Sequence, residues 1–321
     1  MFSNRAQRGL ALVIVLWILT LLTLMAGSFA TTMRRETSVS SALKNNAEAR
    51  ALAESGIVLA QFMLKQDDSA LRWRGDGTVY RLVRPDGELR VRILAEAGKV
   101  DINTSNQAQL GAVLNGAVDD KWQQQRLLNA ILDWRDADDD TRTLGAERTQ
   151  YRRAGLSYGP TNNAFQSLEE LQLVLGMDEY VYSRIEPFLT VYSGNSEVNI
   201  EEAAPELLQL IDRGLKTQHI DNTALQKKLQ DLGGADLEDD GGGETFTTDE
   251  QTYTIMAEAV LGEEGMAGLR AVVQSHGDDP SLPPYEILDW KQNSQGLSLF
   301  DAAMDDRVIT LQDEFTYDDR P

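Results

Sequence analysis

The 321-residue sequence contains no cysteine and only two histidines, His219 and His276, which stand far apart. Disulfide bonds, thiol catalysis and cysteine-ligated zinc are therefore excluded. Two distant histidines also offer few residues for a histidine-based metal site or catalytic triad. Bases are scarce relative to acids, since 30 Lys and Arg face 51 Asp and Glu for a net charge of −21. A chain this acidic repels phosphate backbones, so we expect no nucleic-acid partner.

The motifs of common enzyme classes are also missing. The sequence has no phosphate-binding P-loop and no glycine-rich dinucleotide turn, and its G-x-S-x-G match at 155–159 lies in a loop-like stretch without the strand and helix of a nucleophile elbow. Glycosidase chemistry needs two carboxyl groups that face each other across a cleft with separated pKa values, and acids gathered on one loop do not suggest it. The sequence therefore predicts a protein that is not an enzyme.

Charge is absent from Gly9 to Ala30, a run long enough to span about 30 Å of hydrocarbon as a helix. Arg5 and Arg8 precede the run, and the positive-inside rule places this end in the cytoplasm and the bulk of the chain in the periplasm. Three interpretations compete. The run could be a secretory signal cleaved near "AGSFA", for which it is too long, a plain membrane anchor, or a helix preceded by a cleaved leader.

After the apolar run the periodicity changes from helix to strand and back. Residues 37–65 contain no proline and place apolar residues three to four apart, which predicts that the helix continues. Alternation at 78–94 around a Pro-Asp-Gly turn predicts a hairpin, and residues 251–291 predict three more strands. The block from 99 to 214 is helical in pattern. We predict an α+β fold: a long N-terminal helix packed on a small antiparallel sheet, with a large all-α domain inserted between strands.

A weak internal repeat lies within the helical block. "EVNIEEAAPELLQLI" at 197–211 echoes "KVDINTSNQAQLGAVL" at 99–114, and each leads from a Val-x-Ile segment into a helix. Such units look like helix-hairpin-helix elements, which often hold DNA through backbone amides. The acidity of the chain argues against that use here.

The segment "DWRDADDDTRTLGAE" is the strongest candidate for a metal site. Counted from Asp136, the residues Asp138, Asp140 and Glu147 fall at positions 3, 5 and 12 of an EF-hand loop, and the Arg142 carbonyl falls at position 7. Such oxygen ligands favour a hard cation, so we expect calcium. Position 6 is Thr141 where the turn wants glycine, and the residues after 147 look like a loop. The alternative is a solvated helix end that binds nothing. The candidate ligands are Asp133, Asp136, Asp138, Asp140 and Glu147.

The junction of Arg8-Gly9 with the apolar run resembles the class III signal of type IV pilins and type II secretion pseudopilins. The resemblance implies that a prepilin peptidase cuts between Gly9 and Leu10 and methylates the new N-terminus. That family normally carries Glu at the fifth mature position, where this sequence has Ile14. The departure is typical of the K-type minor pseudopilins, the general secretion pathway protein K family.

The order of spine, strand pair, helical insertion and closing strands also resembles this K-type family, as do "GKVDINT" and "ILDWRDADDD…GAE". The resemblance implies a calcium-binding helical domain and a place at the tip of a periplasmic pseudopilus, with assembly initiated there for export of folded proteins. It implies the I-type and J-type minor pseudopilins, the major pseudopilin and the inner membrane as partners. Two alternatives stay open: a single-pass, inner-membrane-anchored periplasmic calcium-binding or sensor module, and a minor pilin of a type IV pilus.

These inferences divide the chain into eight predicted segments. They are a leader (1–9), the transmembrane (10–30) and periplasmic (31–70) parts of the spine, the first sheet segment (71–98), the helical domain (99–232), an acidic Gly-rich linker (233–250), the remaining strands (251–297) and an acidic tail (298–321).

Overall fold

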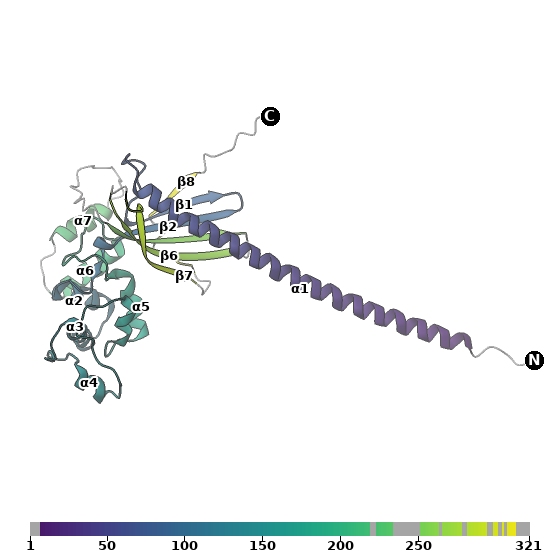
Figure 1. The fold of residues 1–321 in the computed structure, drawn as a ribbon, viewed down its shortest axis with the longest axis horizontal. Helices are drawn as coiled ribbons and strands as arrows, with labels where there is room; N and C mark the ends of the chain where they lie inside the picture. The colour runs from purple at the N-terminus through teal and green to yellow at the C-terminus, as the bar shows by residue number, and fades with distance from the viewer. Residues whose placement is uncertain are drawn as a thin grey trace, which may run out of the picture.

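A computed structural model shows one long helix joined to a head that combines a sheet with a helical domain (Figure 1). Most of the predicted leader, most of the predicted linker and the end of the predicted tail lie outside the described residues. The structure describes residues 7–218, 223–233, 251–262, 265–277, 281–293, 298–300, 304 and 307–312.

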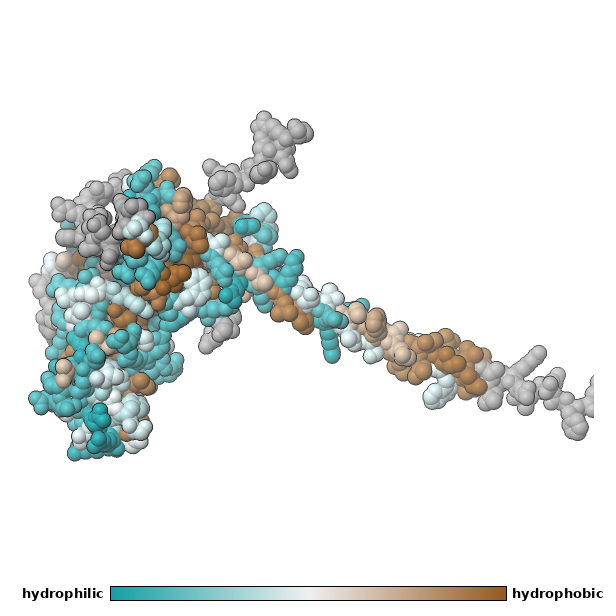
Figure 2. Space-filling view, in the orientation of Figure 1, coloured by the Kyte–Doolittle hydropathy of each residue, from teal (hydrophilic) through white to brown (hydrophobic). Residues whose placement is uncertain are grey.

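The long helix α1 runs from Gln7 to Leu64 and confirms the predicted spine. No proline interrupts its 58 residues, which extend for about 87 Å at the rise of an α-helix. The half that lies clear of the head is rich in outward-facing apolar side chains (Figure 2). There the hydroxyls of Thr20 and Thr23 donate to backbone carbonyls four residues earlier, both at 2.8 Å. Such internal bonds suit hydrocarbon, and the helix is long and apolar enough to cross a membrane.

The second half of α1 packs on the sheet through small residues. A Cβ added to Gly56 would lie 3.0 Å from Leu89 Cδ1, so glycine allows the helix to approach the strands closely. The other buried positions recur every three or four residues, as expected for one face of a helix. They are Ala49, Ala53, Ile57 and Ala60.

The sheet has six strands in the order β7-β6-β5-β2-β1-β8. Neighbouring strands are antiparallel except β8, which runs parallel to β1. The predicted hairpin and the three predicted later strands are confirmed. The strands are β1 (Asp76–Arg84), β2 (Gly87–Ala95), β5 (Thr252–Leu261), β6 (Gly265–Ser275), β7 (Tyr285–Asn293) and β8 (Val308–Gln312).

Strands β2 and β5 pair directly although the helical domain separates them in sequence. Gly87 pairs with Leu261 at one end of the ladder, and Ala95 pairs with Tyr253 at the other. The chain leaves the sheet just after Ala95 and returns at Thr252. Both connections to the inserted domain therefore lie at the same end of adjacent strands.

The inserted domain has a hydrophobic core of its own, separate from the one between α1 and the sheet. Trp134 lies in it and stacks on Phe165 with ring centroids 5.9 Å apart. The two repeat-related helices α2 and α6 pack together so closely that a Cβ on Gly214 would clash with the Ala112 carbonyl. The helical elements are α2 (Gln107–Ala117), α3 (Lys121–Arg135), α4 (Arg148–Arg153), η2 (Leu168–Leu173), α5 (Glu179–Ile185), η3 (Glu186–Phe188), α6 (Pro205–Gln218) and α7 (Thr223–Gly233).

Ion pairs join the inserted domain to the sheet face opposite α1. Arg92 on β2 binds Glu206 at 2.8 Å, and Arg270 on β6 binds Glu186 at 2.6 Å. These arginines alternate along their strands with residues buried under α1, so they point to the other face. The inserted domain is thereby held against that face.

Three details of the predicted segments need correction. The insertion is not all helical, because β3 (Val100–Asp101) and β4 (Leu189–Thr190) form a two-stranded sheet. The 3₁₀ turn η1 (Glu96–Gly98) lies just before it. The stretch expected to be a loop after Glu147 forms α4. The predicted tail contains β8, which pairs with β1 because its five residues can extend that edge of the sheet.

Candidate functional site

The acidic segment forms the connection between α3 and α4. Asp136 is the C-cap of α3, where its N–H donates to the Leu132 carbonyl at 3.2 Å. Glu147 occupies the N-cap position of α4, and its N–H donates to Gln150 Oε1 at 3.1 Å. Helices therefore flank both ends of the predicted twelve-residue loop, which is the arrangement of an EF-hand, although α4 has only six residues.

Asp133, in the last turn of α3, anchors the returning part of this loop. Its carboxylate is fully buried and accepts the Ala146 N–H at 2.8 Å. Any side chain at Gly145 would collide with that carboxylate. Leu144, just before it, has a left-handed backbone with φ of 65°. Asp133 therefore fixes the path of the chain into α4.

Arg142 reaches back from the loop to two of the predicted ligands. Its Nη1 donates to Asp133 Oδ1 at 2.8 Å and also to Asp136 Oδ2. The backbone N–H of Arg142 points at the same Asp133 carboxylate, at 3.3 Å from Oδ2. The hydrogen bond to Asp133, followed by the one to Asp136, raises the pKa of Arg142.

Glu147 is the unsatisfied member of the group. Its side chain is 3% exposed and lies in a capping box facing the Gln150 N–H, but neither carboxylate oxygen accepts a hydrogen bond from the described atoms. The Gln150 N–H donates to the Glu147 backbone carbonyl at 2.8 Å. Burial is the main cause that raises the pKa of Glu147 to about 7, and the charges of Asp133 and Asp136 add to it. Asp136 Oδ1 is also buried without a partner. Burying carboxylate oxygens without donors is costly, so the Glu147 oxygens and Asp136 Oδ1 lack a compensating partner.

The remaining predicted ligands lie on the exposed part of the loop. Asp138 Oδ1 accepts the Asp140 N–H at 2.9 Å. Asn162, from a distant segment, donates to the Asp138 carbonyl at 2.8 Å and to Asp139 Oδ1 at 3.0 Å. The Asn162 side chain therefore ties down the outer part of the loop.

The predicted ligands thus separate into two groups. Arg142 brings Asp133 and Asp136 together, and Glu147 lies within electrostatic range of both, while Asp138 and Asp140 stay on the outer turn. Within the described ranges, no three acidic or histidine side chains are gathered closely enough to hold a metal ion as they stand. The residue types still fit calcium, because orphaned buried carboxylate oxygens are the donors that a hard cation uses.

Sequence reasoning missed the side chain of Arg142 and all of Asn162. For Arg142, a base in the middle of an acidic run was the available signal. For Asn162 no signal existed, because its contacts bridge more than twenty positions. The predicted cleavage site between Gly9 and Leu10 falls in the first turns of α1 and stays a prediction.

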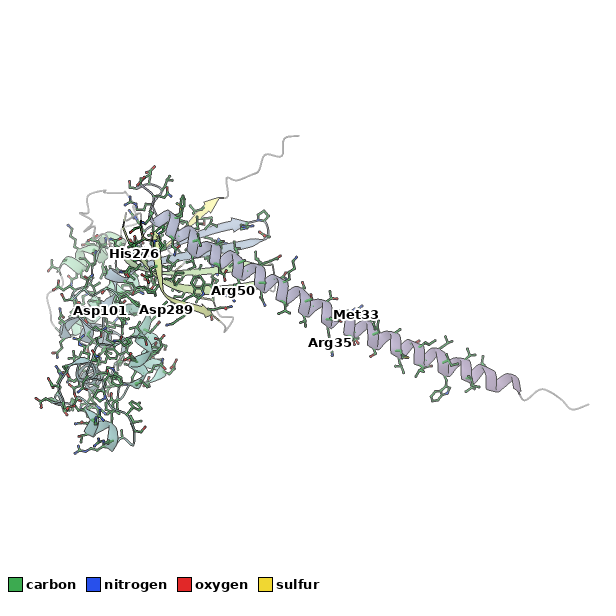
Figure 3. All side chains as sticks on the ribbon, viewed as in Figure 1. Met33, Arg35, Arg50, Asp101, His276 and Asp289 are labelled. Carbon is green, nitrogen blue, oxygen red and sulfur yellow. The ribbon has the colours of Figure 1, made fainter. Side chains whose placement is uncertain are left out.

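A different buried carboxylate in the same domain, Asp101, is labelled in Figure 3. It has hydrogen-bond donors for both of its oxygens. It accepts the backbone N–H groups of Asn103 at 2.8 Å, Thr104 at 3.1 Å and Gly194 at 2.8 Å. The hydroxyl of Ser193 adds a fourth bond at 3.1 Å. Asp101 therefore fastens β3 to the segment after β4 and has no unmet need for a ligand.

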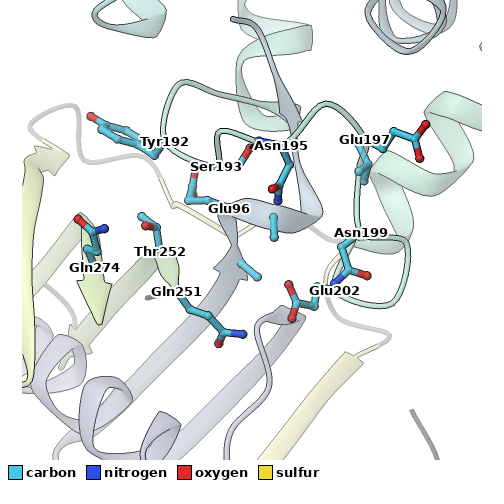
Figure 4. A pocket seen from close by; sticks show the side chains of 13 residues that line it. Glu96, Tyr192, Ser193, Asn195, Glu197, Asn199, Glu202, Gln251, Thr252 and Gln274 are labelled. Atoms are coloured by element: carbon cyan, nitrogen blue, oxygen red, sulfur yellow. Dashed lines mark hydrogen bonds between the residues drawn. The ribbon is translucent and has the colours of Figure 1, made fainter. Parts of the chain in front are cut away.

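A groove of about 640 Å³ lies where the inserted domain meets the sheet (Figure 4). Polar side chains such as Tyr192, Asn195, Glu202 and Gln251 line it. Burial raises the pKa of Glu202. The groove includes none of the predicted ligands, and its described lining shows no nucleophile with an adjacent base.

The chain is similar to known proteins in sequence. A family model described as type II secretion system (T2SS), protein K, matches residues 87–194, which include the acidic loop. Type II secretion system protein K of Klebsiella pneumoniae is 27% identical over 230 residues, which cover 65% of this chain and 70% of that protein. The protein K of Dickeya chrysanthemi is 26% identical over 243 residues, 59% of this chain and 67% of that protein.

A solved structure is also similar, the GspK-GspI-GspJ complex of the type 2 secretion system of enterotoxigenic Escherichia coli. The match has a TM-score of 0.47 at 14% identity and covers 81% of this chain and 99% of the other. The family model and both curated relatives share one description. The chain is similar to type II secretion system protein K over the residues that the family model and the two relatives match.

Proposed function

We propose that this minor pseudopilin caps the tip of a periplasmic pseudopilus and helps to initiate its assembly, for export of folded proteins across the outer membrane. The observation that carries the proposal is the head: the inserted domain lies to one side of the sheet, at the end of α1 farthest from its apolar half (Figure 1). A filament packs its spines side by side, so a head this wide leaves no room for a subunit above it.

The residue at the fifth position after the predicted cleavage site supports the same place. Ile14 lies in the apolar half of α1 and carries no charge. A glutamate at that position would pair with the terminal amine of a neighbouring spine. A subunit without it gives up this pairing, which suits the first member of a stack rather than a repeated one.

The face of α1 that points away from the sheet is suited to partner helices. Val58 and Phe62 are 63% and 64% exposed there, one turn apart and directly opposite the buried face. We assign this face to the spines of the I-type and J-type minor pseudopilins and, below them, the major pseudopilin. The apolar half would lie in the inner membrane with its N-terminus in the cytoplasm after prepilin peptidase has acted.

Cysteine crosslinking tests this arrangement cleanly, because the chain has no cysteine of its own. Val58→Cys and Phe62→Cys should crosslink to partner spines in assembled complexes. Trp122→Cys, exposed on the inserted domain, is the matched control and should stay free if the head stands at the tip. Crosslinks from position 122 to successive subunits along the shaft would contradict the capping proposal.

We also propose that the loop between α3 and α4 binds calcium through Asp133, Asp136 and Glu147, with Asp138 and Asp140 from the outer turn. When bound, the ion would supply the positive charge that the Glu147 oxygens lack. Calorimetry should show calcium binding to the detergent-solubilised chain and its loss in Glu147→Gln. Asp119→Asn, which removes an exposed acid outside the loop, should bind like the unchanged protein.

An intact N-terminus would favour one of the two alternative functions, an anchored calcium-binding or sensor module. Mass spectrometry of the membrane-extracted protein distinguishes the two. A methylated Leu10 at the N-terminus supports the pseudopilin pathway, and an uncleaved leader contradicts it.

A further inference from the structure

We propose that Arg142 is a built-in counter-ion that competes with calcium for Asp133 and Asp136 and has to leave before the ion can bind. The inference rests on the calcium proposal above and adds a residue that holds the loop in its calcium-free form. It follows from what the guanidinium touches, from the charge it leaves unbalanced and from its exposure.

The contacts place Arg142 where a cation between the two aspartates would go. One nitrogen, Nη1, bonds both carboxylates, at 2.8 Å to Asp133 Oδ1 and also to Asp136 Oδ2. The second oxygen of Asp133 already accepts the Ala146 N–H. An ion that binds Asp133 therefore needs the Oδ1 that Arg142 now occupies, and the charge of the guanidinium opposes a cation at the unpartnered Oδ1 of Asp136.

Arg142 offsets only part of the negative charge of the loop, so it replaces a divalent ion incompletely. It brings one positive charge to a loop with six acids between positions 133 and 147. The nearby Arg135 does not help, because its guanidinium donates to the backbone carbonyls of Ile102 and Ser105. Glu147 stays buried without a donor. A divalent ion would offset more charge and satisfy those oxygens, so exchange becomes favourable once calcium is abundant.

The exposure of Arg142 permits the exchange. Its side chain is 40% exposed, whereas Asp133 is fully buried at the other end of the bond. The guanidinium can therefore swing into solvent while Asp133 stays in place. The backbone N–H of Arg142 can keep its contact with Asp133, so the loop need not unfold during the exchange.

Two consequences follow for the loop. Without calcium, Arg142 keeps Asp133 and Asp136 together, so the calcium-free loop stays closed. With calcium, the ion must first displace the arginine, and its apparent affinity is lowered by the stability of that closed form. Arg142 thus sets the calcium concentration at which the loop changes state.

The test compares calcium titrations of the full chain in detergent, measured by calorimetry, for the unchanged protein, Arg142→Gln and Arg152→Gln. Arg152 is an exposed base on α4, so its loss removes the same charge nearby without breaking the bridge. Arg142→Gln should bind calcium about tenfold more tightly, and Arg152→Gln should change the affinity by less than about threefold. Arg142→Lys, which keeps the charge but not the planar guanidinium, should lie in between.

A second readout guards against a variant that fails to fold. With a chelator present, Arg142→Gln should melt at a lower temperature than the unchanged protein, and calcium should remove most of that difference. Equal or weaker calcium binding by a folded Arg142→Gln would overturn the role of Arg142 while leaving the calcium site intact. Absence of calcium binding in all of these proteins would overturn the site itself.

Discussion

Asp101 and Glu147 are buried carboxylates of one domain with opposite surroundings. Four donors surround Asp101, three of them backbone N–H groups. Glu147 is as deeply buried and has no donor among the described atoms. The fold is therefore able to satisfy a buried acid where the acid serves only structure. An acid without donors among the described residues of the same domain is the observation behind the calcium proposal.

The largest effect on stability should come from removing the carboxylate of Asp101, whose oxygens have hydrogen-bond donors. Asp101→Ala leaves buried N–H groups without acceptors and should lower the free energy of unfolding by about 3–5 kcal/mol. Denaturant titration of the purified chain measures this. Asp86→Ala, at the exposed turn between β1 and β2, should change it by less than about 0.5 kcal/mol. A loss as small for Asp101 would remove one side of the comparison.

The second-largest effect on stability should come from adding calcium, which would supply positive charge next to Glu147. At a hundred times its dissociation constant, calcium should stabilise the protein by about 2.7 kcal/mol, because it binds the folded state alone. Thermal melts with calcium and with a chelator measure the gain. Magnesium should give less, since it demands a stricter octahedral geometry. If calcium left the melting temperature unchanged, Glu147 would need another explanation.

Neutralising Glu147 should act in opposite directions in the two conditions. With a chelator and above pH 7, where Glu147 is ionised, Glu147→Gln removes an uncompensated buried charge and should raise the stability by about 1 kcal/mol. With calcium, the same variant loses a ligand and should be the less stable protein. Parallel melts of both proteins give the sign in each condition. Destabilisation with the chelator would mean that Glu147 has a donor after all.

The smallest effect should come from the exposed part of the loop. Asn162→Ala removes the amide that bridges Asp138 and Asp139 and should lower the stability by about 0.5–1.5 kcal/mol. Its calcium affinity should fall as well, because the outer turn becomes less ordered before binding. Asn163→Ala, the adjacent amide, is the control. Equal affinity in both variants would exclude the outer turn from the site.

The long elements were predictable because their patterns are long. The uncharged run after Gly9 and the alternation around the Pro-Asp-Gly turn predicted α1 and the first hairpin. Strand β8 was missed because five residues inside an acidic stretch carry little periodicity, and its pairing with β1 is decided by the sheet. Helix α4 was missed because "RTQYRR" has a single apolar residue, Tyr151, which is buried.

The acids of the loop were predictable from spacing, but their roles were not. Spacing treats Asp133, Asp136 and Glu147 as equals, while the fold gives the first two an arginine and the third nothing. Which acid keeps a partner depends on where Arg142 turns in three dimensions. Contacts of this kind are visible only in the folded chain.

The direct pairing of β2 with β5 makes the helical domain a removable module. Since Ala95 already lies opposite Tyr253, a short turn from Ala95 to Thr252 would close a continuous hairpin. The spine and the sheet could then form a pilin-like subunit without the inserted helical domain. By the same join, an unrelated domain whose two ends lie close together could be grafted onto this stalk.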